Sequence, residues 1–304
     1  IMAADGHCKT YDAAADGYVR SEGAGVVVLK LLSQAQVDGD RIYAVIRGCA
    51  SNNDGHCDSF MAPSTKGQQG GLRKACQNAG IDPLSIGDVE AHGPGTKAGD
   101  PIEITTLGEV LCAGRPADQP LLVGSVKTNI GHTEGAAGVA GLIKAVLCLR
   151  HRLIPANLHF HTPNPDIPWQ DYAVKVPTEL MPWPHYGSAP HRAVVCSYGI
   201  AGTNTYVVVE EALQENNTSS ILEHDSAPAP FLLPLSAQTP EALKELAHHY
   251  LAHLEDECYA DQALHDIATT ASLRRTHYDY RLAIVCNSRQ DAHDKLAAFL
   301  HNQA

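Results

Sequence analysis

The sequence predicts a layered α/β/α domain followed by a smaller α/β unit. Short β-branched apolar runs alternate with helix-like segments through the first two-thirds of the chain, a polar Ser/Ala/Pro-rich stretch interrupts the pattern at 213–230, and patterned sequence then resumes. With 304 residues the chain is long enough for two such units, each with its own core. We therefore divide it into 1–212, a linker at 213–230, and a second unit at 231–304.

The first region alternates strands and helices. Apolar, β-branched runs predict strands at 25–32, 42–49, 88–91, 121–126, 192–197 and 205–211. Helical spacing predicts helices at 67–78, 100–111 and 135–150. For the second helix, Asp100 is the expected N-cap, since Pro101 follows it and Glu103 stands three residues further on.

The second region has its own pattern of short elements. Strands are expected at 231–236 and 280–286, and helices from Pro240 to about Leu254, at 261–273 and at 291–300. Thr239 directly before Pro240 is a typical N-cap. These elements would form a small α/β unit of their own.

The composition describes an ordinary soluble globular protein and excludes several classes of partner. The chain is 44% hydrophobic and 18% charged, with a formal net charge of −12. That charge argues against nucleic acid and against an anionic membrane surface, because both would repel it. No run reaches transmembrane length, no leader peptide is visible, and nine scattered cysteines without a CxxC pair are typical of reduced thiols. We therefore expect a cytoplasmic location, and we expect the chain, which opens on Ile1, to be part of a longer protein.

Two histidine motifs are the strongest functional signal. Residues 90–96 read EAHGPGT and residues 131–138 read GHTEGAAG, so that His92 and His132 each stand among glycines or small residues at the end of an expected element. A neutral imidazole whose Nδ1 is engaged elsewhere donates one hydrogen bond from Nε2. Two such donors aimed at one carbonyl oxygen would stabilise an enolate, as an oxyanion hole does. The alternative is that each histidine is a structural loop residue, and chemistry alone leaves both interpretations open.

Other histidines could suggest a metal site. His159 and His161 are close in sequence, and His249 and His253 have the i, i+4 spacing of zinc ligands, next to His248. No matching carboxylate or cysteine pattern follows, so we interpret the second group as a solvated helix face and expect no metal.

The motifs resemble those of the β-ketoacyl synthase (ketosynthase) domain of type I polyketide and fatty acid synthases. The matching stretches are 12–23 (DAAADGYVRSEG), 52–55 (NNDG), 90–103, 126–132 (VKTNIGH) and 197–204 (SYGIAGTN), which together span most of residues 1–212. Residues 231–304 resemble, more weakly, the linker subdomain between the ketosynthase and an acyltransferase. The resemblance implies the C-terminal half of a thiolase-like fold and decarboxylative Claisen condensation of an acyl thioester with a malonyl-type unit.

The resemblance also assigns roles to individual residues. It implies that His92 and His132 hold the malonyl thioester carbonyl, and that Lys127 supports them electrostatically through Glu134. The backbone N–H of Tyr198, next to Gly199, would lie at the oxyanion hole of the acylated cysteine, and the Tyr198 ring would stand where the family has a gatekeeping phenylalanine. Thr96 would hydrogen-bond the carrier's phosphopantetheine arm.

Partners follow from the same resemblance. We expect an acyl carrier protein, which supplies phosphopantetheine, the N-terminal half of the ketosynthase, a neighbouring acyltransferase domain and a homodimer. This chain itself is expected to bind no cofactor.

The chain departs from the family pattern at two places. The nucleophilic cysteine motif is absent, and Cys196 stands where the family has a serine, so we interpret it as a packed residue. Pro94 replaces the first threonine of the usual HGTGT and removes both a hydroxyl group and a backbone donor. Three hypotheses remain open: part of a condensing ketosynthase that is inactive alone, a non-condensing acyl-transfer domain, and a non-catalytic scaffold.

Overall fold

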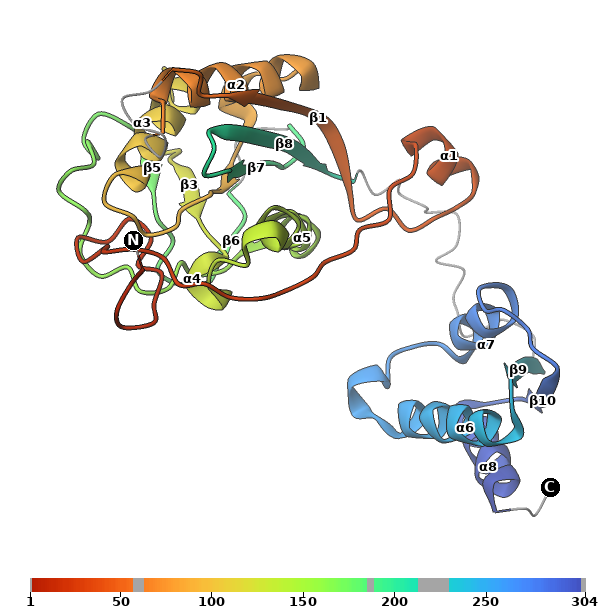
Figure 1. Cartoon of the computed structure of the whole chain (residues 1–304). Helices are drawn as coiled ribbons and strands as arrows, with labels where there is room; N and C mark the ends of the chain where they lie inside the picture. Colours follow the sequence, from red (N-terminus) through yellow and green to blue (C-terminus); the bar gives the residue numbers. More distant parts are fainter. Residues whose placement is uncertain (1, 57–62, 185–188, 213–229, 302–304) are drawn as a thin grey trace. The chain divides into compact units, whose positions relative to one another are not determined.

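The computed structural model describes residues 2–56, 63–184, 189–212 and 230–301. The chain divides into two compact units, Ile1–Leu213 and Gln214–Ala304 (Figure 1). Most of the expected linker, 213–229, lies outside the described residues.

A six-stranded mixed sheet forms the centre of the first unit. Its strands are β1 (Ala44–Asn53), β2 (Asp88–Glu90), β3 (Leu121–Gly124), β5 (Val174–Lys175), β7 (Arg192–Tyr198) and β8 (Thr203–Glu211), in the order β1-β8-β7-β2-β3-β5. The four strands from β7 to β5 in this order run parallel, whereas β8 is antiparallel to both of its neighbours. Two short strands, β4 (Leu153–Ile154) and β6 (Met181–Pro182), pair separately.

Helices cover both faces of this sheet, as the sequence predicts. The helices of the unit are α1 (Leu32–Val37), α2 (Thr65–Ala79), α3 (Gly99–Leu111), α4 (Lys127–Ile130) and α5 (Ala137–His151), with 3-10 turns at Pro83–Ser85 and Glu134–Ala136. Alternate residues of a strand face opposite sides of a sheet. On β8, Tyr206 and Val208 join the core under α2 and α3, whereas Val209 joins the core under α5. Figure 1 shows α2 and α5 on opposite sides of β7 and β8.

The predicted strand at 25–32 is wrong. Residues 21–31 adopt no regular structure and α1 begins at Leu32. Val26 is 88% exposed and Val28 is 95% exposed, so the apolar run finds no neighbouring strand within the described chain. A β-branched run needs a partner strand to complete its hydrogen bonds, and local sequence does not supply one.

The predicted N-cap of α3 is also wrong. Ala98 occupies the N-cap position and makes no side-chain cap. Asp100 and Glu103 lie inside the first turns and accept hydrogen bonds from the preceding loop instead. The consequence is a link between this helix and the histidine loop, which is described below.

The second unit is a two-stranded sheet with three helices. Strand β9 (Phe231–Ala237) pairs antiparallel with β10 (Tyr280–Cys286). The helices are α6 (Pro240–Glu255), α7 (Leu264–Leu273) and α8 (Arg289–Leu300), with a 3-10 turn at Glu257–Tyr259. The Thr239 hydroxyl accepts from the Ala242 N–H and caps α6 as predicted. Buried residues that include Leu233, Leu243 and Leu296 form a core within this unit.

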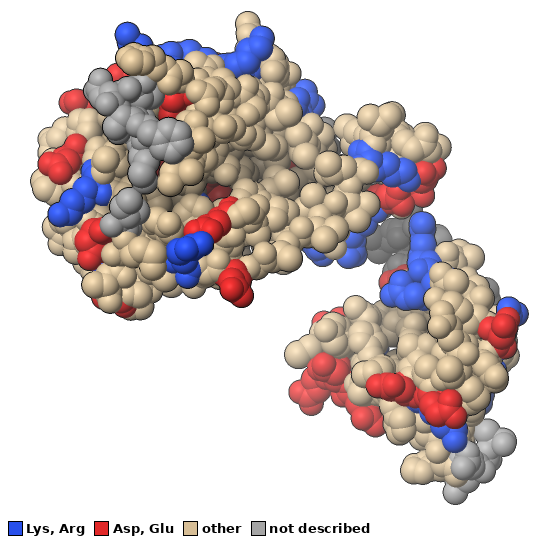
Figure 2. All heavy atoms as spheres, viewed as in Figure 1, with Lys and Arg blue, Asp and Glu red and all other residues tan. Residues whose placement is uncertain are grey.

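Charged side chains are distributed in small groups over the first unit. On the face seen in Figure 2, Lys and Arg side chains are interspersed with Asp and Glu, and broad areas carry neither. Among the described residues, no helix is long and apolar enough to cross a membrane.

Candidate active site

The fold brings the two motif histidines together. His92 follows the end of β2, and His132 follows α4 after Gly131, whose positive φ of 76° lets the chain turn back. Their ring centroids lie 5.2 Å apart with an interplanar angle of 78°. Two residues that are forty positions apart in sequence therefore form one site.

Both imidazoles are held in the same tautomer. The Tyr198 N–H donates to His92 Nδ1 at 3.2 Å, and the Glu134 N–H donates to His132 Nδ1 at 3.0 Å. An Nδ1 that accepts a hydrogen bond carries no proton, so the neutral ring carries its proton on Nε2. Each histidine thus presents one N–H donor to the site.

Burial keeps both rings neutral at physiological pH. It lowers the pKa of His92 well below its usual value, and the neighbouring Lys127 and His132 lower this pKa further. Burial, followed by Lys127, lowers the pKa of His132 to about 4. A neutral ring that carries its proton on Nε2 can donate a hydrogen bond to a developing oxyanion.

Two buried carboxylates of α3 hold the His92 loop. Glu103 accepts from the N–H groups of His92 (2.9 Å) and Gly93 (2.8 Å). Asp100 accepts from the N–H groups of Gly95 and Thr96, both at 3.1 Å. The backbone is therefore fixed on both sides of the turn.

Pro94 leaves no backbone N–H of this loop without an acceptor, because proline has no N–H. It stands between the residues whose N–H groups are bound by Asp100 and Glu103. Gly95 has a φ of +83°, and a Cβ there would meet the Lys9 backbone nitrogen at 2.9 Å, so glycine is needed after it. The lost threonine hydroxyl is thus the main difference from the family motif.

The segment 18–21 and an ion pair hold the His132 loop. The His132 N–H donates to the Val19 carbonyl at 2.7 Å, and the His132 carbonyl accepts from the Ser21 N–H at 3.0 Å. Arg20 pairs with Glu134 at 2.7 Å, and both side chains are largely exposed. Glu134 has a φ of +50°, a region that costs energy for a residue with a side chain.

Within the described residues no ion pair joins Lys127 to Glu134, through which the resemblance has it act. The Lys127 side chain is only 4% exposed, and its strongest carboxylate neighbours are Glu90 and Glu103, while Glu134 is engaged with Arg20. Burial lowers the pKa of Lys127, and the two buried carboxylates oppose that shift. Its effect on the histidines is direct, since its charge lowers the pKa of each.

The other predicted site residues lie at the edges of this pair. The Tyr198 ring centroid lies 5.1 Å from that of His92. The backbone N–H of Tyr198, which is predicted to lie at an oxyanion hole, donates to His92 Nδ1. Gly199 lies in the β7–β8 turn, where its N–H donates to the Thr203 carbonyl. The Thr96 hydroxyl accepts from the Gly99 N–H, which leaves its own proton available to a ligand. Cys196 is 3% exposed, and burial raises the pKa of its thiol well above the usual value, as expected of a packed residue.

The metal interpretation gains no support. In the described parts of the chain, no group of three or more His, Cys, Asp or Glu side chains could hold a metal ion. His159 stacks on His7, and His253 contacts Gln262 through Nε2.

Local sequence pattern does not identify several neighbours of the histidine pair. Glu103 has the spacing of a capping residue, and no spacing assigns a role to Arg20, Tyr11 or Lys144. The available signal was the i, i+3 spacing of Asp100 and Glu103 on the helix that follows the histidine loop, since that spacing places both carboxylates on one face.

Comparisons with known proteins identify the family. The description "Beta-ketoacyl synthase, C-terminal domain" matches residues 43–161, "Beta-ketoacyl synthase, N-terminal domain" matches 1–35, and "CurL-like, PKS C-terminal" matches 231–296. One component of the phenolphthiocerol/phthiocerol polyketide synthase of Mycobacterium tuberculosis is 46% identical over 98% of this chain and 16% of its own length. Erythronolide synthase EryA3 of Saccharopolyspora erythraea is 44% identical over 96% of this chain and 9% of its own length.

Solved structures give the same result. The ketosynthase from module 6 of the bacillaene synthase of Bacillus subtilis 168 superposes with a TM-score of 0.85 at 38% identity, covering 100% of this chain and 52% of that one. The oxazolomycin ketosynthase domain OzmH KS7 of Streptomyces albus gives 0.87 at 34% identity, covering 99% and 51%. The fold is thiolase-like, and the chain spans about half the length of these ketosynthase chains.

Proposed function

This chain belongs to the β-ketoacyl synthase family of polyketide synthases, and we propose that it supplies the half of the ketosynthase site that handles the malonyl-type extender. The observation that carries this proposal is the matched state of the two histidines. Both accept a backbone N–H at Nδ1, so both present Nε2–H to the same site. The thioester carbonyl oxygen of the extender is the group that these donors would bind.

The proposed step is decarboxylation followed by carbon–carbon bond formation. The bond between the malonyl carboxylate and the α-carbon breaks, carbon dioxide leaves, and the electron pair moves onto the thioester carbonyl oxygen. His92 and His132 stabilise that enolate oxygen. Burial, and after it the charge of Lys127, lowers the pKa of both rings and keeps them neutral. The enolate carbon then attacks the carbonyl of an acyl thioester, whose thiolate leaves.

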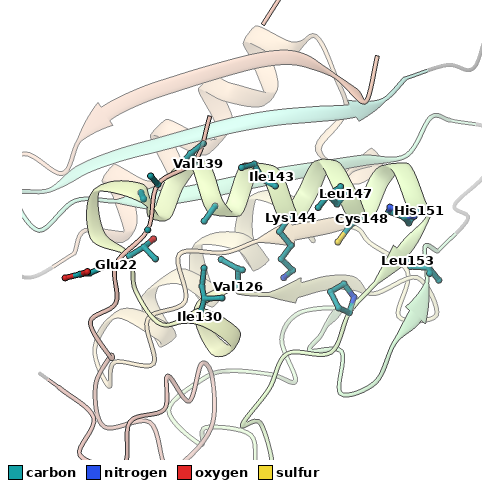
Figure 3. A pocket seen from close by; sticks show the side chains of 17 residues that line it. Glu22, Val126, Ile130, Val139, Ile143, Lys144, Leu147, Cys148, His151 and Leu153 are labelled. Carbon is teal, nitrogen blue, oxygen red and sulfur yellow. The ribbon is translucent and has the colours of Figure 1, made fainter. Parts of the chain in front are cut away.

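The acyl thioester would be carried by a cysteine of the N-terminal half of the ketosynthase. An exposed apolar surface of the first unit supports the presence of this N-terminal half as a partner. A groove of about 650 Å³ runs beside α5 and is lined mainly by apolar side chains, among them Ile130, Val139, Ile143 and Leu147 (Figure 3). The neighbouring run at 26–31 is also exposed and, apart from Lys30, apolar. We propose that the N-terminal half covers this groove and pairs with this run.

The remaining partners follow from the same chemistry. The malonyl and acyl groups arrive on the phosphopantetheine arm of an acyl carrier protein, for which the free proton of the Thr96 hydroxyl is the proposed contact. The second unit is proposed to be the linker subdomain to an acyltransferase domain, and the complete ketosynthase is proposed to be a homodimer.

An assay of malonyl decarboxylation tests the proposal. In the complete ketosynthase that contains this sequence, His132→Ala and His92→Ala should each reduce carbon dioxide release by at least about 100-fold, as loss of an oxyanion donor does. The matched control is His249→Ala, which removes an exposed imidazole of α6 and should leave the rate unchanged. The isolated 304 residues should form no β-ketoacyl product. Retained decarboxylation in His132→Ala, or product from the isolated chain, would contradict the proposal.

A further inference from the structure

Glu90 links three segments near the site: the end of β2, the segment before Lys127, and α5. It is the last residue of β2, two positions before His92, and it is only 2% exposed. Its Oε1 accepts from the Val126 N–H at 2.7 Å, directly before Lys127. Its Oε2 accepts from Lys144 Nζ at 2.6 Å, on α5, the helix that begins five residues after His132.

Lys144 reaches Glu90 from outside the site. Its side chain is 18% exposed and lines the apolar groove beside α5, and Figure 3 shows it extending from α5 toward the segment with Val126. One turn earlier, Gly141 brings the helix close to the sheet, since a Cβ there would lie 3.0 Å from Glu90 Cγ. The ammonium group is thus directed onto one carboxylate by the packing of α5 on β2.

The second carboxyl group near Lys144 is a weaker partner. Asp88 lies on the same face of β2, two residues before Glu90, and makes no ion pair within 4.0 Å among the described residues. Burial raises the pKa of Asp88 to about 7. The negative charge opposite Lys144 is therefore mainly that of Glu90. Removal of Lys144 would leave this buried carboxylate without its ion-pair partner and with Lys127 as the remaining cation near it.

We propose that Lys144 is a positioning residue of the active site: through Glu90 it fixes the Val126–Lys127 segment, and with it the place of Lys127 relative to the two histidines. The inference rests on the proposed function. A misplacement of a catalytic group by about 1 Å costs about 100-fold in rate, so a counterion outside the site can control turnover.

Decarboxylation kinetics of the complete ketosynthase test this inference. Lys144→Met should lower kcat by about 10- to 100-fold with KM for the malonyl carrier changed less than about twofold, because the groups that bind the carrier arm are untouched. Lys144→Arg, which keeps a cation for Glu90, should recover most of the rate. Lys74→Met is the matched control, since it removes an exposed lysine of α2 that does not line this groove.

A double substitution separates positioning from loss of fold. In Glu90→Gln, the amide oxygen can still accept from Val126, and no charge remains for Lys144 to neutralise. The factor by which Lys144→Met lowers kcat should therefore be at least about fivefold smaller in the Glu90→Gln background than in the wild type. If Lys144→Met does not fold, the rate of the double variant relative to Glu90→Gln alone gives the same answer.

The outcomes are distinct. An equal loss from Lys144→Met in both backgrounds, or an unchanged kcat in Lys144→Met, overturns the role of Lys144. If His132→Ala also keeps its decarboxylation rate, the proposed function itself fails. If only His132→Ala loses the rate, the function stands and the inference alone is rejected.

Discussion

The loops that carry His92 and His132 reach the same chemical state by different means. The His92 loop is enclosed by α3, where Glu103 and Asp100 bind four of its N–H groups. The His132 loop is held by backbone contacts to residues 19 and 21 and by the exposed pair of Arg20 with Glu134. One histidine is therefore fixed by a buried network and the other largely by backbone pairing.

This difference predicts unequal tolerance to substitution. A buried hydrogen-bond acceptor that is lost leaves unsatisfied N–H groups, which costs far more than an exposed ion pair. The His92 loop should thus be sensitive to single changes in α3, and the His132 loop should tolerate changes at its surface. Four predictions follow that comparison from the largest effect to the smallest.

Glu103→Gln should have the largest effect. A glutamine offers one carbonyl oxygen and places its NH2 group against the His92 or Gly93 N–H, so a buried donor loses its acceptor. We expect the free energy of unfolding to fall by about 2–4 kcal/mol and decarboxylation to be lost. Urea unfolding of the variant measures this, and a loss below about 1 kcal/mol would show that the buried network does not hold the loop.

The pH dependence of stability should report on His132. The folded ring titrates at about 4, whereas an unfolded histidine titrates near 6.5. The contribution of the neutral His132 ring to the free energy of unfolding is therefore fully present above about pH 6.5. It is lost as the pH falls toward 4, because the unfolded chain takes up the proton first. The stability difference between wild type and His132→Gln should shrink by about 1–2 kcal/mol over that range, after allowance for partial exposure. A constant difference would show that the folded ring titrates normally.

Tyr11→Phe should have a smaller effect on the same network. The Tyr11 hydroxyl donates to Glu103 Oε2 at 3.1 Å, and this carboxylate keeps its two backbone donors when the hydroxyl is removed. We expect a loss of about 1 kcal/mol in thermal unfolding and a decarboxylation rate within about threefold of wild type. A loss as large as that of Glu103→Gln would contradict the view that the backbone contacts dominate.

Arg20→Gln should have the smallest effect. Its pair with Glu134 is exposed to solvent, and such pairs contribute little to stability. We expect a change in the free energy of unfolding smaller than that of Tyr11→Phe, which disappears in 1 M salt, and a modest loss of rate. An effect that persists in high salt would mean that Arg20 holds the His132 loop by more than charge.

The sequence predicts well where the pattern is local. The strands at β7 and β8, the turn between them and helices α2, α5 and α6 follow from apolar spacing and caps. The family resemblance implies that His92 and His132 share one site, and the structure places the two rings side by side.

The errors share one physical cause, which is that local spacing does not specify the hydrogen-bond or ion-pair partner of a residue. The run at 25–32 has strand-forming residues, yet no strand of the described chain pairs with it. Glu103 has the spacing of a capping residue, yet the N–H groups of the histidine loop take its oxygens. Glu134 is seven residues from Lys127, yet its partner is Arg20, 114 residues away.

The central claim is that both site histidines are neutral and carry their proton on Nε2. Nitrogen NMR of the folded protein with ¹⁵N-labelled histidine tests it directly, with His92→Gln and His132→Gln used to assign the two rings. At pH 7 each ring should show a protonated Nε2 and an unprotonated, hydrogen-bonded Nδ1. A proton on Nδ1, or on both nitrogens of either ring, would contradict the proposed pair of oxyanion donors.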